Sequence, residues 1–155
     1  MKDRPDSAQE LGARALRLLA RREHSRAELA RKLAPHAESR EALERLLDAL
    51  VAKKQLSEER YVEQRAHALA RKYGAGRILQ DLRAKGIREE TAARAAALAA
   101  PGDLERARAI LARKYRIPAD SREARAKRAR FLLGRGFSHD VVRRALDLAS
   151  EESTE

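Results

Sequence analysis

Apolar side chains recur three and four residues apart along this chain, which is the spacing of one face of an α-helix. Leu29 with Leu33 and Ile78 with Leu82 are pairs four residues apart. The residues that favour strands, Val, Ile and Thr, occur only ten times in 155 residues and form no alternating run. The pattern therefore predicts an all-α fold.

Residues typical of helix ends divide this pattern into nine helices. Ser25 and Glu28 have the spacing of a capping box, and Gly86 and Gly136 suit the left-handed position after a helix. Further helix starts are expected at Ser39, Ser57, Asp103, Ser121 and Ser138, with Pro35, Pro101 and Pro118 between helices. The predicted helices cover 10–22, 25–34, 39–54, 57–72, 75–85, 89–99, 103–115, 121–135 and 138–149.

These helices form an internal repeat. The string Leu-Ala-Arg-Lys-Tyr occurs at 69–73 and 111–115, and Leu-Ala-Arg-Arg at 19–22. The echoes predict tandem three-helix repeats over 10–56, 57–102 and 103–150. Residues 1–9 and the acidic residues 151–155 are expected to be flexible tails. Stacked repeats of this kind would form an elongated, curved array.

The charge of the chain favours a polyanionic partner. Lys and Arg number 35 against 24 Asp and Glu, for a formal net charge of +11 and a pI near 10.6. Residues 103–150 are the most basic repeat, with a net charge of +7. A solvated charged face is the alternative explanation of such a run, and the sequence leaves both open.

Basic pairs recur at one position of the repeat, as Arg21–Arg22, Arg71–Lys72 and Arg113–Lys114. They could line one face, or stabilise helix dipoles at C-terminal ends. The other candidates for contact with a partner or the DNA backbone are Arg77, Lys85, Arg122, Arg125, Lys127, Arg128, Arg130 and Arg135. Tyr73, Tyr115 and Phe131 are expected to pack against helices, because five aromatic residues are too few for a base-stacking platform.

The sequence offers no parts for catalysis. Cysteine is absent, the four histidines are scattered, and no nucleophile-elbow or phosphate-binding loop motif occurs. We therefore expect no enzyme activity, metal or cofactor. With no signal-like N-terminal segment and no long apolar run, a cytoplasmic monomer is expected.

Four segments resemble the RecX family, in order and spacing. They are Ala15 to Leu33 with its Ser25-Arg26-x-Glu28-Leu29 centre, Leu47 to Tyr61, Gly76-Arg77-Ile78 to Gly86-Ile87, and Phe131-Leu132-x-x-Arg135-Gly136-Phe137. Gln55, Glu58 or Glu59, and Tyr61 stand where that family usually has Gly, Asp and Phe. These departures put in doubt only the role of an acidic residue at that turn.

The resemblance implies three three-helix repeats that bind in the groove of the RecA–DNA filament. It also implies inhibition of RecA's strand-exchange, ATPase and co-protease activities, and so a place in DNA repair, recombination and the SOS response. Two alternatives remain open from the residues: a non-specific DNA-binding protein of helix-turn-helix character, and a structural adaptor. The chain has no Asn and only four Gln, which disfavours base-specific readout.

Overall fold

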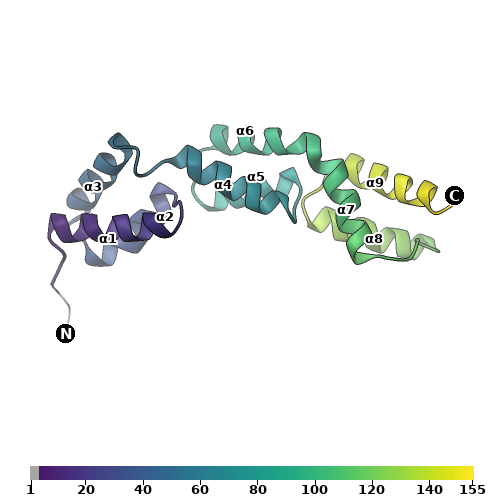
Figure 1. The fold of residues 1–155 in the computed structure, drawn as a ribbon, viewed down its shortest axis with the longest axis horizontal. Helices are drawn as coiled ribbons and strands as arrows, with labels where there is room; N and C mark the ends of the chain where they lie inside the picture. The colour runs from purple at the N-terminus through teal and green to yellow at the C-terminus, as the bar shows by residue number, and fades with distance from the viewer. Residues whose placement is uncertain (1–3) are drawn as a thin grey trace. The chain divides into compact units, whose positions relative to one another are not determined.

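A computed structural model describes residues 4–155 and confirms the all-α fold, with no strand in that part of the chain. Its helices are α1 (Ala8–Arg21), α2 (Arg26–Leu33), α3 (Arg40–Ala52), α4 (Glu58–Ala70), α5 (Ala75–Ala84), α6 (Glu89–Ala99), α7 (Asp103–Lys114), α8 (Arg122–Gly134) and α9 (His139–Glu152) (Figure 1). The short 3₁₀ helices η1 (Ala34–His36) and η2 (Ala100–Gly102) follow α2 and α6. Three α-helices fall in each predicted repeat, while the repeat boundaries themselves stay a prediction.

Serine side chains begin most of these helices, as predicted. The hydroxyl accepts a hydrogen bond from the backbone amide three residues later at Ser25, Ser39, Ser57, Ser121 and Ser138. The capping box expected at Ser25 is only half formed, because the Glu28 carboxylate accepts from Arg22 instead of from the Ser25 amide.

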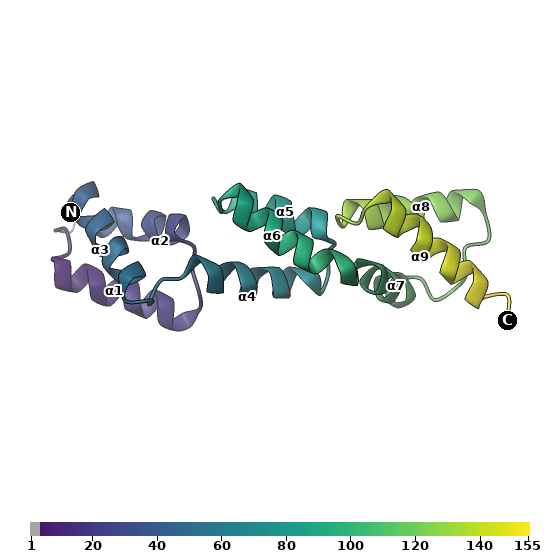
Figure 2. The ribbon, with the colours of Figure 1, turned by 90° about the horizontal axis from the view of Figure 1, so that it is seen from above.

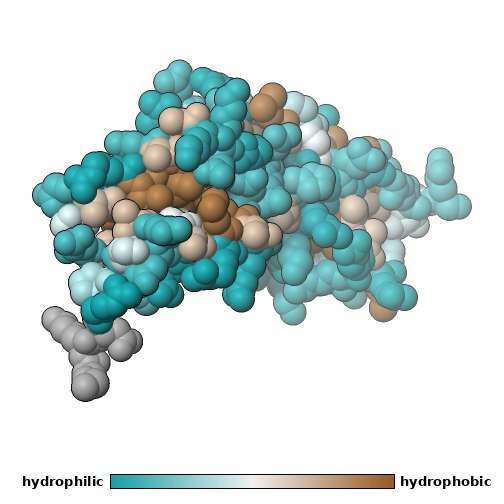
Figure 3. All heavy atoms as spheres, turned by 60° about the vertical axis from the view of Figure 1, so that its left-hand side comes forward, coloured by the Kyte–Doolittle hydropathy of each residue, from teal (hydrophilic) through white to brown (hydrophobic). Residues whose placement is uncertain are grey.

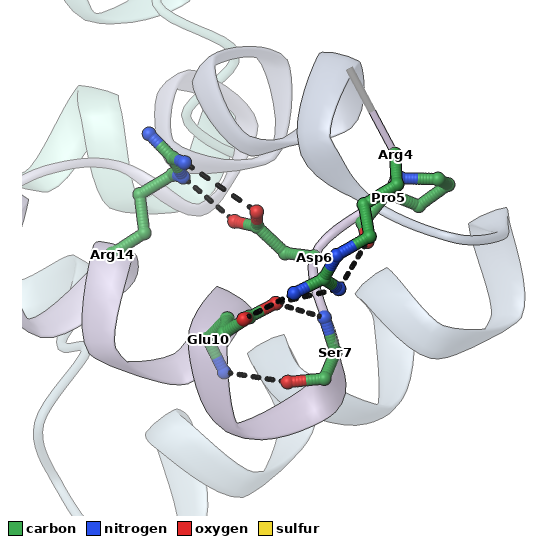
Figure 4. Close-up of polar contacts among 6 residues, drawn as sticks. All are labelled: Arg4, Pro5, Asp6, Ser7, Glu10 and Arg14. Atoms are coloured by element: carbon green, nitrogen blue, oxygen red, sulfur yellow. Dashed lines mark hydrogen bonds and ion pairs between the residues drawn. The ribbon is translucent and has the colours of Figure 1, made fainter.

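A complete capping box lies at the start of α1, where the sequence predicted only a tail. The Ser7 hydroxyl accepts from the Glu10 amide at 3.2 Å, and the Glu10 carboxylate accepts from the Ser7 amide at 2.8 Å (Figure 4). Asp6 also accepts from Arg14 Nε at 2.8 Å. Helix therefore reaches into the predicted tails at both ends of the chain, from Ala8 at one end and to Glu152 at the other.

Glycines end α5 and α8 in the left-handed conformation, as their positions predicted. Gly86 has φ of +80° and Gly136 has φ of +88°. An L side chain rarely adopts this backbone conformation, so both positions favour glycine.

Two compact units divide the chain. One holds residues up to Gln64 together with Lys85–Ile87, and the other holds Arg65–Ala84 and Arg88–Glu155. The core of the first unit comes mainly from leucines of α1, α2 and α3: Leu11, Ala15, Leu29, Leu33, Leu43, Leu47, Leu50 and Leu56. Figure 3 shows an apolar area surrounded by hydrophilic side chains in the near part of the view.

The second unit holds two packed groups of helices. In one, α5 lies against α6, and Ile78 and Leu82 of α5 and Ala92 of α6 are fully buried (Figure 2). In the other, α9 packs on α7 and α8 around a core of Ala107, Leu111, Leu132, Phe137, Val142, Ala145 and Leu146.

Candidate cation–aromatic interface

Three of the five aromatic side chains gather on the surface of the second unit. Tyr61 and Phe137 are buried in the core, whereas Tyr73, Tyr115 and Phe131 are half-buried. The repeated string Leu-Ala-Arg-Lys-Tyr supplies two of these rings, because each copy places a tyrosine just after a helix, Tyr73 after α4 and Tyr115 after α7. The third ring comes from α8.

Helix α8 supplies Arg128 and Phe131, and Arg135 caps its C-terminal end, so the three residues follow one another at spacings of three and four. Side chains at this spacing share one face of a helix. Phe131 meets Tyr115 edge to face, with ring centroids 6.0 Å apart and planes at 80°. Both side chains also pack against the core of α7, α8 and α9, which confirms the expected packing.

The turn between α8 and α9 brings Arg135 beside Tyr73. The Gly74 amide donates to the Arg135 carbonyl at 2.8 Å, and the Gly76 amide donates to the Gly136 carbonyl at 3.1 Å. The contact is backbone against backbone: a Cβ on Gly74 would lie 2.7 Å from the Gly136 oxygen. Glycine at these positions therefore allows the two turns to meet.

Asp103 completes this junction in a way that the sequence did not predict. The side chain was expected to cap α7, but its Oδ2 accepts from the Ala75 amide at 3.0 Å, at the start of α5. Its other oxygen accepts from Arg106, and the residue is 4% exposed. Three successive amides, of Gly74, Ala75 and Gly76, are thus satisfied by residues from 103 onward.

The three rings and four cations form one alternating row, which we call the cation–aromatic row. Its order is Arg77, Tyr73, Arg135, Phe131, Lys114, Tyr115, Arg128. The distances from each cationic centre to the next ring centroid are 5.0 Å, 5.3 Å, 5.1 Å, 4.1 Å, 5.8 Å and 4.6 Å along that order. All six lie within the range of cation–π attraction.

The cations of the row have no acidic partner in the part of the chain that the structure describes. No salt bridge within residues 4–155 involves Arg77, Lys114, Arg128 or Arg135. Arg128 instead donates to the Ile117 carbonyl at 2.6 Å, and Arg135 to the Lys72 carbonyl at 3.3 Å. The row therefore presents uncompensated positive charge, which suits an anionic ligand.

The predicted contact residues fall into three groups. Arg77, Lys114, Arg128 and Arg135 form the row. Arg22 and Arg125 are held in ion pairs with Glu28 and Asp147. The others lie outside the row, exposed except for half-buried Lys85: Arg21, Arg71, Lys72, Arg113, Arg122, Lys127 and Arg130. Their role in binding stays a prediction.

A second polar cluster surrounds His24 at the turn between α1 and α2. His24 is buried, with Nδ1 3.0 Å from the Arg22 carbonyl and Nε2 3.2 Å from Lys32 Nζ. Because an ammonium only donates, Nε2 accepts and Nδ1 carries the proton. Burial lowers the pKa of His24, and the hydrogen bond from Arg22 lowers the pKa of Glu28 to about 2. This cluster anchors Arg22 in the first unit.

Two kinds of site are absent from residues 4–155. No group of three or more His, Asp or Glu side chains is placed to hold a metal ion there. No helix in that range has the length and apolar character needed to cross a bilayer.

Known proteins with similar sequences and folds indicate the family to which this chain belongs. Residues 57–95 match the family model of the second three-helix domain of RecX, and residues 102–146 match that of the third. The chain is 50% identical to the regulatory protein RecX of Leptothrix cholodnii, over 92% of this chain and 90% of the relative. It is 41% identical to that of Neisseria gonorrhoeae, over 94% of each. The crystal structure of RecX from Lactobacillus salivarius has the same fold, with a TM-score of 0.78 at 24% identity, covering 91% of this chain and 97% of that one.

The fold and the row define a helical-repeat protein with a basic, ring-bearing surface and no metal cluster within residues 4–155. Sequence identity over nine-tenths of the chain then gives the family. The chain belongs to the RecX family of regulatory proteins.

Proposed function

We propose that this chain binds the RecA–DNA nucleoprotein filament and inhibits RecA's ATPase, strand-exchange and co-protease activities, acting as a monomer without catalysis of its own. The proposal places it in the cytoplasm, in DNA repair and recombination and the SOS response. The filament is the principal partner, and the DNA phosphate backbone a weaker, non-specific one.

One observation supports this function beyond family membership: the cation–aromatic row carries four cations that no acidic side chain of residues 4–155 neutralises. A filament groove is strongly negative where its DNA lies near the surface, so a basic surface is attracted to it. The alternative of base-specific DNA recognition lacks support, because the row contains no Asn or Gln to read base edges.

The test is RecA ATP hydrolysis on single-stranded DNA, with this protein titrated at substoichiometric ratios. Inhibition well below one protein per RecA monomer is expected. The double variant Arg128→Gln/Arg135→Gln should need a higher concentration for the same inhibition, whereas Arg45→Gln, an exposed charge on α3, should behave as wild type. Inhibition only after the DNA itself is saturated would mean simple competition for phosphate and would refute a filament-specific role.

A further inference from the structure

We propose that Tyr73, Tyr115 and Phe131 are positioning residues that hold the cations of the row as a preformed site for successive phosphates of a nucleic-acid strand. No ring stacks on a base. The inference rests on the proposed function in taking the DNA of the filament as the ligand, and it specifies what the row recognises: the phosphodiester backbone, without regard to base.

The ring faces are already engaged within the protein. Tyr73 has Arg77 and Arg135 within 5.3 Å of its centroid, and Phe131 has Lys114 at 4.1 Å and Arg135 at 5.1 Å. Tyr115 has Arg128 at 4.6 Å and meets the Phe131 ring as well. Base stacking requires an open aromatic face, so these rings serve the cations rather than a base.

Arg128 of α8 and Arg135 just after α8 are each held at more than one point. Arg135 lies against two rings and donates to the Lys72 carbonyl, while Arg128 lies against Tyr115 and donates to the Ile117 carbonyl. A guanidinium has five N–H donors, so each keeps most of them for a ligand. Because these side chains are ordered before binding, less conformational entropy is lost when a phosphate arrives.

The linear order of the row favours a strand over a folded acidic surface. Adjacent cations share a ring, so the positive charges follow one another in the order Arg77, Arg135, Lys114 and Arg128. A nucleic-acid strand carries a charge at every nucleotide. Successive phosphates can therefore meet successive cations.

The first experiment measures fluorescence anisotropy of the full chain with two labelled probes, an oligothymidylate and an abasic oligonucleotide of equal length. If phosphates alone are recognised, the two dissociation constants should agree within about three-fold. Stacking of even one base would separate them by about five-fold or more. Such a loss with the abasic strand would overturn the inference, and the comparison needs no variant that might fail to fold.

Variants then test the role of the rings. Tyr73→Leu/Tyr115→Leu should weaken binding of both probes about three- to ten-fold, and Tyr73→Phe/Tyr115→Phe should restore it, because the ring rather than the hydroxyl holds the cation. The salt dependence should stay near wild type in the Leu variant. Arg135→Gln should instead reduce the slope of log K against log salt by about 0.7, whereas Arg45→Gln should leave it unchanged. Failure of the Phe variant to restore binding would contradict a positioning role.

Failure of the phosphate-binding inference is distinguishable from failure of the proposed function, because the anisotropy assay contains no RecA. Loss of RecA inhibition in Arg135→Gln with oligonucleotide binding at wild-type strength would mean that the row faces protein. The inference would then be wrong while the regulatory function stood. If the oligonucleotides bind as expected but the protein has no effect on RecA, the inference would stand and the proposed regulatory function would be wrong.

Discussion

Replacement of Gly136 by alanine should destabilise the second unit severely. The residue has φ of +88°, and a Cβ there would overlap the Arg77 amide nitrogen and lie 2.5 Å from the Arg77 Cβ. The left-handed conformation costs a non-glycine residue about 1–2 kcal/mol. To remove this overlap, the turn before α5 must also move away from the turn after α8. That movement breaks the hydrogen bonds donated by the Gly74 and Gly76 amides, at about 0.5–1.5 kcal/mol each. The expected loss is therefore roughly 2–5 kcal/mol.

Two other glycines provide matched controls for this change. Gly134 ends α8, and a Cβ added there would meet nothing within 4 Å, so Gly134→Ala should stabilise the helix by about 0.5–1 kcal/mol. Gly86 has φ of +80° but only the Ala27 Cβ at 3.3 Å, so Gly86→Ala should cost about 1–2 kcal/mol. Urea denaturation followed by circular dichroism at equal protein concentration measures all three. A Gly136→Ala variant whose free energy of unfolding lies within about 1 kcal/mol of wild type would refute the argument that this junction cannot separate at low energetic cost.

Three further changes test single contacts by the same denaturation assay. Asp103→Ala should cost about 3–5 kcal/mol, because it leaves Arg106 and an amide of α5 without their buried partner; a cost below about 1 kcal/mol would contradict that role. Glu28 has its pKa lowered to about 2 by Arg22, so its contribution is fully present above about pH 4.5 and is lost as pH falls toward 2. Wild type should therefore lose about 1 kcal/mol more than Glu28→Gln between pH 5 and pH 2, and parallel curves would show that the pair contributes nothing. Ser7→Ala should cost about 1 kcal/mol and shorten α1, and an unchanged midpoint would mean that the cap is dispensable.

The helices were predictable from sequence because the signals that define them are local. A serine hydroxyl reaches an amide three residues away, and a left-handed glycine ends a helix wherever the fold places it. The predicted starts and ends lie within three residues of the observed ones. The box at Ser7 and Glu10, which the sequence prediction assigned in part to a tail, is also local, and its spacing matches the capping rule.

The candidate site was only partly predictable, because it depends on contacts between residues far apart in the chain. The four cations of the row were among the fourteen predicted contact residues, but nothing in the sequence separated them from the other ten. That separation comes from Tyr73 and Phe131, which lie 58 positions apart and share Arg135. The helix start at Asp103 was confirmed, but the partner of its side chain was not predictable, since that amide lies 28 residues earlier. One local hint existed: Arg77 follows Tyr73 by four residues.

The junction at Gly136 has a consequence for the order in which the chain folds during synthesis. The amides of Gly74, Ala75 and Gly76 find their acceptors only in residues 103, 135 and 136. While the ribosome has made only the first two repeats, the start of α5 has no protein acceptor and must be solvated. Helix α5 therefore reaches its final stability only after the turn that follows α8 has emerged, so its stability depends on residues of the third repeat.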